Sequence, residues 1–245
     1  MTDPPMLVVA GGMIARSKRS KHIHWCHDLY PDIMPAIGMR IPKGVMEFLR
    51  KLSRKTMKKC DRVIVIGRCM ARHLIHSGLD PRLVAVVPNW TETELAYSSE
   101  NATSKSPKTI DGIRPPAEQK HDPIDPRFRV LYSGNLGRAH PIQPILDAAE
   151  ILSKDHPEIE FLFVGEGGQF DRLATERAKL GLHNIRFMPP QPVENLRAMM
   201  ESGDVHLITM KNEALGMLVP SKLYAAFAVA RPVVFVGHEQ SEAAR

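Results

Sequence analysis

The feature that most limits what this chain can fold into is a regular alternation of short apolar runs and longer helical patterns from Arg127 onward. The apolar runs read RVLYSG, EFLFVG, NIRFM, VHLITM and PVVFVG, and stretches such as PIQPILDAAEILSK separate them. Short apolar strands joined by helices are typical of a parallel sheet covered on both faces. The pattern predicts an α/β domain of five strands and four crossovers, a Rossmann-like half. Gly181 and Gly203 follow helical patterns, where left-handed helix caps are expected.

The same alternation, in shorter form, precedes Pro88. HIHWCHD, DRVIVIG and LVAVVPN predict strands, and PKGVMEFLRKLSRKTMKKC predicts a helix. Between the two parts lies a polar stretch with Pro and Ser throughout and no period, which indicates a linker or long surface loop. We therefore expect an N-terminal domain over residues 1–90, a linker over 91–127 and a C-terminal domain over 128–245. Two such domains place a ligand cleft between the carboxyl ends of their parallel sheets.

Charge and cysteine content narrow the class of partner and the compartment. The formal net charge of +6 favours an anionic partner, which could be nucleic acid, an acidic membrane surface or a phosphorylated substrate. The three cysteines form no C-x-x-C pair, which argues for a reducing compartment. The N-terminus lacks the basic region and cleavage site of a signal peptide, and no stretch approaches the roughly 20 apolar residues of a membrane-spanning helix. We expect a cytoplasmic protein.

Two glycine-rich turns are candidates for binding an anion. In YSGNLGRAHP, Gly134 and Asn135 follow a strand and precede a helix, so the amides from Gly134 to Gly137 would face a diphosphate and Arg138 would add a fixed positive charge. FVGEGGQFDRL forms a second such turn with Glu166 at its tip. Because the G-x-x-G spacing is common, a tight turn that binds nothing is the alternative in both cases.

The stretch NEALGMLVPSKLY is more specific. Glu213 would follow a strand, Gly216 and Met217 would let the backbone approach a ligand, and Pro220 would open a helix. Ser221 and Lys222 would then lie in the first helical turn, where free amides, a hydroxyl and an ammonium make an anion site. The carboxylate of Glu213 could accept hydrogen bonds from sugar hydroxyls.

The stretch KHIHWCHDLYPD allows two interpretations. His22, His24 and Cys26 alternate on a predicted strand and could converge on zinc. Alternating residues on a buried strand are more often satisfied by the protein interior, so we favour the view that this stretch holds no metal. His27 would point the other way.

Taken in order, HDLYPD, DRVIVIG, VVPNW, LYSGNLG, FVGEG and LVPSKLY...ARPVV resemble the family-4 retaining glycosyltransferases of GT-B architecture, especially those that build bacterial surface polysaccharides. The resemblance spans nearly the whole chain. It implies two Rossmann-like domains, of which the C-terminal one holds a nucleotide-sugar donor and the N-terminal one presents the acceptor and a catalytic histidine. The family's histidine-aspartate pair matches His27 and Asp28, which places them in the cleft. The resemblance also implies no metal and no cofactor.

The resemblance assigns roles to further residues. Arg138 and Lys222 would neutralise the donor diphosphate, Glu213 would contact the transferred sugar, and the nucleobase would lie near residues 186–191. The complete expected donor-binding set is Gly134, Asn135, Arg138, Glu166, Pro190, Glu213, Gly216, Met217, Leu218, Val219, Ser221 and Lys222.

The chain departs from the family pattern in two respects. Many relatives carry a second glutamate that contacts ribose, where this chain has Ser221 and Lys222. The family's first strand and glycine-rich loop, and its last strand and closing helices, have no counterpart, so we expect a chain truncated at both ends with an incomplete N-terminal domain.

A cationic stripe lies on the helix predicted in EFLRKLSRKTMKKCDR. Basic residues recur there at three- and four-residue steps beside apolar ones, a pattern that suits docking on anionic lipid. The alternative is that these residues form an ordinary solvent-exposed helix face. Nucleic acid is disfavoured because no aromatic residues interleave with the charges. The stripe comprises Lys51, Arg54, Lys55, Lys58 and Arg62.

The predicted function is transfer of a sugar from a nucleoside diphosphate donor, expected to be a UDP-sugar, to a polysaccharide or lipid-linked oligosaccharide with retention. The expected location is the cytoplasm, with peripheral contact to the inner face of the cell membrane. Two alternatives remain open: a non-catalytic remnant that binds nucleotide or a partner protein, and a nucleotide-sugar epimerase.

Overall fold

The computed structural model describes residues 5–91 and 127–245. Residues 92–126, which hold nearly all of the expected linker, lie outside the described residues. The chain forms two compact units. Unit 1 comprises Met1–Asn89, Met210–Pro220 and Gly237–Arg245, and unit 2 comprises Trp90–Thr209 and Ser221–Val236. Two segments that the sequence assigns to the C-terminal domain therefore pack with unit 1.

Unit 2 has the five parallel strands that the hydrophobic pattern predicts. Their order in the sheet is β6-β5-β4-β7-β8, so the strand order reverses beside β4. The strands are β4 (Phe128–Ser133), β5 (Ile159–Val164), β6 (Ile185–Met188), β7 (Val205–Thr209) and β8 (Val233–Val236). The connecting helices are α5 (Gln143–Asp155), α6 (Phe170–Lys179), α7 (Val193–Glu201) and α8 (Lys222–Ala228).

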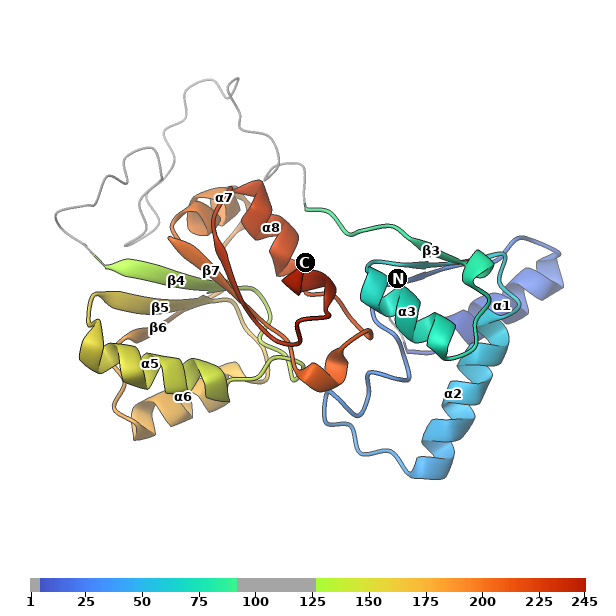
Figure 1. Ribbon diagram of the computed structural model, residues 1–245, viewed down its shortest axis with the longest axis horizontal. Helices are drawn as coiled ribbons and strands as arrows, with labels where there is room; N and C mark the ends of the chain where they lie inside the picture. Colours follow the sequence, from blue (N-terminus) through green and yellow to red (C-terminus); the bar gives the residue numbers. More distant parts are fainter. Residues whose placement is uncertain (1–4, 92–126) are drawn as a thin grey trace, which may run out of the picture. The chain divides into compact units, whose positions relative to one another are not determined.

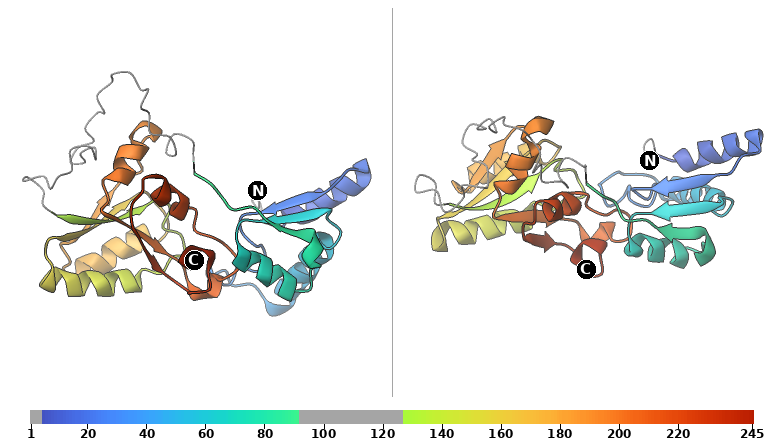
Figure 2. Two further views of the ribbon diagram at one scale, coloured as in Figure 1. Left: turned by 45° about the horizontal axis from the view of Figure 1, so that its top comes forward. Right: turned by 90° about the horizontal axis from the view of Figure 1, so that it is seen from above.

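Helices cover both faces of this sheet. Tyr132 and Phe163 pack with Ile145 and Leu173 of α5 and α6, whereas the alternate residues, such as Leu162, pack with the helices α7 and α8 on the other face. Figures 1 and 2 show α5 and α6 on one side of the sheet. The Rossmann-like arrangement expected of residues 128–245 is thus confirmed for the sheet and its helices.

Unit 1 contains a smaller parallel sheet in the order β1-β2-β3. Its strands are β1 (Ile23–Cys26), β2 (Arg62–Val65) and β3 (Val84–Val86), and its helices are α1 (Leu7–Lys18), α2 (Lys43–Met57) and α3 (Arg68–His76). Short 3-10 helices are η1 (Pro81–Leu83), η3 (Asn212–Ala214) and η4 (Glu242–Ala244). Within residues 5–91 and 127–245, no helix has the length and apolarity needed to cross a bilayer.

Helix α1 was not expected from the sequence. It contains the pair Gly11 and Gly12, and glycine lowers helix propensity. A Cβ atom on Gly12 would lie 2.7 Å from Cγ2 of Thr56 on α2, and one on Gly11 would lie 3.0 Å from Nε2 of His22. The glycine pair therefore permits α1 to pack closely against the rest of unit 1.

The two predicted glycine caps differ in outcome. Gly181 has φ +63° after α6, and the amide of Leu182 donates to the carbonyl of Arg177, as in a left-handed cap. Gly203 does not adopt a left-handed conformation, so that prediction was wrong. A Cβ atom there would lie 2.7 Å from Cβ of Leu131, which explains the glycine by close packing against β4.

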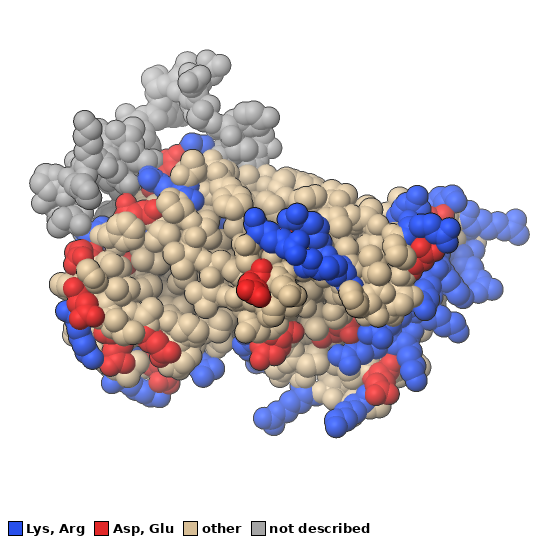
Figure 3. Space-filling model, viewed as in Figure 1, with Lys and Arg blue, Asp and Glu red and all other residues tan. Residues whose placement is uncertain are grey.

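The predicted cationic stripe also needs correction. Arg62 is not on the helix, because it begins β2 and its Nη1 donates to the carbonyl of Asp61. Arg54 lies with its Nη2 3.7 Å from Oδ1 of the buried Asp32, so its charge is paired. Lys51, Lys55 and Lys58 are exposed. Figure 3 shows Lys and Arg side chains gathered on the side of unit 1 that carries α1 and α2.

Candidate functional site

In unit 2 the two glycine-rich turns lie next to each other, after the carboxyl ends of β4 and β5. Gly134 has φ +102° and Gly165 has φ +137°, a backbone region that L side chains rarely adopt. A Cβ atom on Gly165 would collide with the carbonyl oxygen of Gly134, and one on Gly167 would collide with the side chain of Asn135. Only glycine at these positions lets the turns touch.

Hydrogen bonds join the two turns into one element. The amide of Leu136 donates to the carbonyl of Glu166 over 2.8 Å, and the amide of Gln169 donates back to the carbonyl of Leu136 over 3.1 Å. The amide of Gly134 donates to the carbonyl of Val164 over 2.8 Å. The amides of Gly134 and Leu136 are thus engaged inside the protein, in contrast to the expectation that they face a diphosphate.

Lys222, the first residue of α8, reaches the first turn. Its Nζ donates to the carbonyl of Asn135 over 3.0 Å and lies 5.0 Å from the centroid of the Tyr132 ring. The hydroxyl of Tyr132 donates to the same carbonyl over 3.1 Å. Burial lowers the pKa of Lys222 to about 8. Among the described residues no carboxylate pairs with this ammonium, so its charge is available to an anion.

The other expected donor-binding residues of unit 2 are more peripheral. Asn135, Arg138, Glu166, Pro190 and Ser221 are exposed. Arg138 lies on the first turn and makes no ion pair with any residue the structure describes. Ser221 is the N-cap of α8 without a side-chain capping bond, and Pro190 follows the neighbouring strand β6. Unit 2 thus brings together Gly134, Asn135, Glu166 and Lys222.

Sequence reasoning missed two residues at this end of the sheet. Tyr132 is fully buried beneath Lys222, and burial raises the pKa of its hydroxyl. His140 lies with Nδ1 2.5 Å from the carbonyl of Thr209 at the end of β7, and its own carbonyl accepts from Nε2 of Gln169 over 3.3 Å. His140 stands within the quoted motif YSGNLGRAHP, and a buried tyrosine needs a hydroxyl partner, so both could have been found.

In unit 1, His27 and Asp28 directly follow β1, as expected. The amide of Leu29 donates to the carbonyl of Met217 over 2.7 Å, and Asp28 and Leu218 form an antiparallel bridge. The ring of His27 stacks on that of Trp25 with centroids 5.6 Å apart. The structure therefore brings the expected catalytic pair to the segment Met210–Pro220, which carries much of the expected donor loop.

Close packing, rather than an open backbone, explains the glycine in this segment. Gly216 has φ +74°, and a Cβ atom there would lie 3.0 Å from the carbonyl oxygen of Cys69 and 3.0 Å from Cβ of His73. The amide of Met217 donates to the carbonyl of Ala214 over 3.0 Å. Val219 is buried, and its Cγ2 would lie 2.7 Å from a Cβ atom on Gly67. Glu213, in η3, is exposed.

His24, within β1, and His22, just before it, have different surroundings. His24 is buried, and desolvation lowers its pKa to about 4, while burial raises the pKa of Cys26 to about 12. His22 lies instead with Nδ1 3.4 Å from Sγ of Cys60. In the part of the chain that the structure describes, no group of three His, Cys, Asp or Glu residues could hold a metal ion.

Two protein families match the chain. Residues 114–237 match the family described as Glycosyl transferases group 1, and residues 3–95 match Glycosyltransferase Family 4. The chain belongs to the group 1 glycosyl transferases. The match to this glycosyltransferase family covers the two turns, Lys222 and the segment Met210–Pro220, and the Family 4 match covers His27 and Asp28.

Two curated relatives extend over most of this glycosyltransferase chain. It is 30% identical to the putative colanic acid biosynthesis glycosyl transferase WcaI of Escherichia coli strain K12, over 97% of the chain and 57% of the relative. It is 24% identical to the probable glycosyltransferase WbjE of Pseudomonas aeruginosa, over 100% of the chain and 58% of the relative. The chain thus spans less than two thirds of these relatives.

Solved structures share the fold. HepE of Anabaena in complex with UDP and glucose matches with a TM-score of 0.65 and 19% identity, over 94% of this chain and 57% of that one. Sucrose-phosphate synthase from Thermosynechococcus elongatus matches with a TM-score of 0.61 and 16% identity, over 94% and 55%. These neighbours and the two parallel sheets confirm the expected α/β GT-B class for this glycosyltransferase.

Proposed function

We propose that unit 2 binds a UDP-sugar and that the protein transfers the sugar, with retention, to a polysaccharide or a lipid-linked oligosaccharide. The observation that carries this proposal is the ammonium of Lys222 on the Asn135 turn, without a carboxylate partner among the described residues. HepE, which shares the fold, has been solved with UDP and glucose and with UDP-glucose. The relative WcaI, which is named for colanic acid biosynthesis, supports a polysaccharide acceptor.

The main contribution that these residues can make to the reaction is to stabilise developing charge. When the bond between sugar and diphosphate breaks, negative charge develops on the leaving phosphate. Lys222 and Arg138 would oppose it, and the partly buried setting of Lys222 strengthens that interaction. Glu213 would accept hydrogen bonds from the transferred sugar. His27 and Asp28 would position or polarise groups at the reacting centre.

The proposal includes independence from divalent metal. Side-chain cations would supply the charge that a metal ion supplies in other diphosphate enzymes. Titration of the purified chain with UDP, in buffer with magnesium and in buffer with EDTA, tests this. Equal affinities are expected, and a loss of binding in EDTA would overturn this part of the proposal.

Donor binding is tested with a lysine variant. Lys222→Ala removes a charge-assisted contact, for which about 1.5–3 kcal/mol is usual, so UDP affinity should fall by roughly 10- to 100-fold. Lys179→Ala is the matched control, because Lys179 is an exposed lysine on α6 that pairs with Glu176. Unchanged UDP affinity in Lys222→Ala would remove this residue from the site.

Turnover separates transfer from the alternatives. Sugar release from a panel of UDP-sugars is measured with and without a lipid-linked acceptor, and the anomeric configuration of the product is read by NMR. Acceptor-dependent release of an α-product from an α-donor supports retaining transfer. An epimerised nucleotide-sugar without acceptor would indicate an epimerase, and UDP binding without any turnover would indicate a binding module.

Peripheral membrane contact is part of the same proposal, now limited to Lys51, Lys55 and Lys58. These exposed side chains lie on one face of α2 and its end, and each positive charge near an anionic surface contributes about 1 kcal/mol. The fraction of protein that sediments with phosphatidylglycerol vesicles should fall sharply when all three lysines are replaced by Glu. The control reverses Lys154, Arg172 and Lys179 on α5 and α6. Equal sedimentation of the two variants would refute the stripe as a membrane contact.

A further inference from the structure

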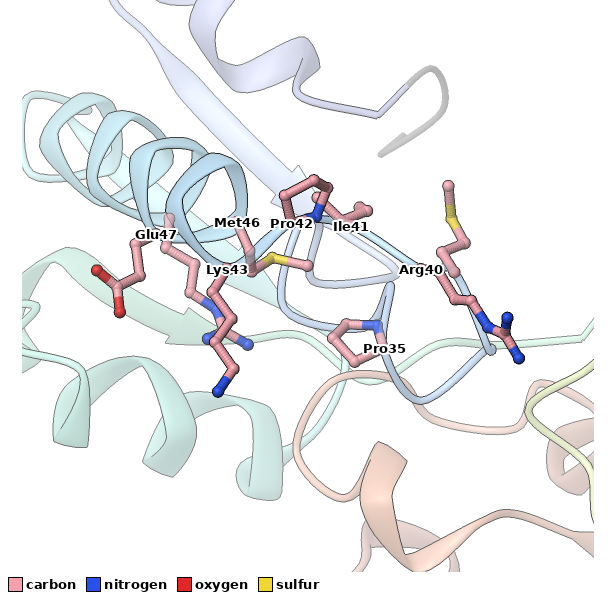
Figure 4. A pocket seen from close by; sticks show the side chains of 9 residues that line it. Pro35, Arg40, Ile41, Pro42, Lys43, Met46 and Glu47 are labelled. Carbon is pink, nitrogen blue, oxygen red and sulfur yellow. The ribbon is translucent and has the colours of Figure 1, made fainter.

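Unit 1 contains a cavity that none of the expected donor-binding or catalytic residues lines. Its volume is about 720 Å³, and it lies between the loop before α2 and the first two turns of that helix. Figure 4 shows its side chains, with Met46 extending from α2 toward the loop that carries Pro35. A volume of this size is typical of small-molecule sites.

Positive charge is in excess around this cavity. Arg40 and Lys43 line it and are exposed, and neither side chain has a hydrogen bond or ion pair with any residue in the described ranges. Arg50 also lines it, and its Nε lies 2.9 Å from Oδ1 of Asp32, a carboxylate that Arg50 shares with Arg54. Glu47 is the carboxylate among the described lining residues. Two unpaired cations against one carboxylate favour an anionic ligand.

The rest of the lining is apolar. Met39, Ile41 and Met46 line the cavity together with two prolines. Met39 is 43% exposed, whereas Met46 is buried beneath the cavity. Methionine side chains adapt to apolar ligands of irregular shape. A bare phosphate or a phosphorylated sugar would gain nothing from such a wall, but an anion joined to an apolar chain would cover it.

The loop that forms the cavity is tied to the expected catalytic pair. It begins directly after His27 and Asp28, and Leu29 at its start donates to the carbonyl of Met217. Nζ of Lys211 donates to the carbonyl of Ala36 over 3.4 Å. A ligand in the cavity is therefore held by the loop that directly follows His27 and Asp28.

We propose that this cavity binds the acceptor through a phosphate or diphosphate group joined to an apolar chain. Arg40 and Lys43 pair with the phosphate, and Met39, Ile41 and Met46 contact the chain. The identification of this ligand as the acceptor rests on the proposed transferase function, whereas binding of a lipid phosphate in the cavity does not.

Geranyl diphosphate, a water-soluble lipid diphosphate, is the probe. It is titrated calorimetrically into the full chain with UDP at saturating concentration, so that the donor site is occupied. Inorganic diphosphate and glucose 1-phosphate are titrated in parallel. We expect geranyl diphosphate to bind at least tenfold more tightly than either. Arg40→Gln/Lys43→Gln should weaken it at least tenfold, and Lys18→Gln/Lys59→Gln, which removes two exposed charges of unit 1 outside the cavity, less than twofold.

Several outcomes overturn the proposal. Equal affinity of the wild type and the Arg40/Lys43 variant does so, and so does equal affinity for geranyl diphosphate and the two phosphates without an apolar chain. Methyl NMR of labelled methionine gives a readout that needs no charge variant, with the signals of Met39 and Met46 assigned by substitution with Leu. Shifts confined to these two methyls support the cavity, and unshifted signals at saturation overturn it. Probe binding without any sugar transfer would refute the transferase function alone.

Discussion

The lowered pKa of Lys222 predicts that UDP affinity falls as the pH rises from 7 to 9. Burial against Tyr132 and the Asn135 turn brings this pKa to about 8, and only the protonated ammonium attracts a diphosphate. The sign follows directly, because a group that must be protonated for binding is lost as the pH passes upward through its pKa in the free protein. A bound diphosphate would raise that pKa again.

The size of the effect follows from the same value. With a pKa of about 8, the ammonium is about nine-tenths protonated at pH 7 and about one-tenth protonated at pH 9. If only the protonated form binds, the dissociation constant rises about tenfold, which is about 1.4 kcal/mol. The assay is calorimetric titration with UDP at half-unit pH steps, at constant ionic strength.

Two variants isolate the lysine from other titrating groups. Lys222→Arg keeps a positive charge at every pH in the range. It should therefore bind UDP with an affinity that is nearly flat between pH 7 and 9, apart from the ionisation of the nucleotide. Lys222→Ala should bind weakly and show the same flat profile. A pH dependence as steep in either variant as in the wild type would refute the assignment to Lys222.

Three further predictions follow from the packing and the ionisable groups. Gly165→Ala forces a Cβ atom against the carbonyl of Gly134 at a residue with φ +137°, so it should destabilise the fold by about 1–3 kcal/mol and abolish UDP binding. Gly168→Ala is the control, because a Cβ atom there would meet nothing within 4 Å, and it should leave the thermal melting point nearly unchanged. Burial raises the pKa of Glu242, but its hydrogen bonds from Arg68 outweigh this and lower it overall, so the ion pair stabilises the fold above the ordinary glutamate range and is lost as the pH falls through the lowered pKa. Glu242→Gln should lower stability by up to about 1 kcal/mol at pH 7 and by less at pH 3, and an equal difference in melting temperature at both pH values would contradict this. Burial raises the pKa of Cys26 to about 12, so iodoacetamide at pH 8 should label it only after denaturation, and rapid native labelling detected by mass spectrometry would refute its burial.

The larger features of the fold could be predicted because they depend on local periodicity. Each strand of unit 2 is a short, mostly apolar run, and each is bounded by glycine or proline. Helix α8 begins at Lys222, two residues after Pro220, where the sequence predicts that it opens, and an error of this size is usual at helix boundaries. Helix α1 was missed because Gly11 and Gly12 argue against a helix locally, and only their contact with Thr56 and His22 explains them.

The candidate site could be predicted in part. The motif around Gly134 and the lysine of PSK point to the same anion site, and the structure places their atoms within hydrogen-bonding distance. The sequence does not show which amides are already bonded, because the partners of the Gly134 and Leu136 amides are the carbonyls of Val164 and Glu166, about 30 residues away along the chain. For the same reason, Gly216 suggested an open backbone, whereas its actual neighbour is the carbonyl of Cys69 on α3.

Unit 1 is built from three separate segments of the chain, which limits how the protein can be divided into folded pieces. The chain passes from unit 1 to unit 2 after Asn89, returns for Met210–Pro220, leaves again, and returns for Gly237–Arg245. A protease that cut between residues 91 and 127 would therefore give two pieces, neither of which holds unit 1 complete. The C-terminal piece would carry Met210–Pro220 and Gly237–Arg245 without the rest of unit 1, on which these segments pack. The two pieces should therefore give more folded protein when they are expressed together than when each is expressed alone, as in fragment complementation.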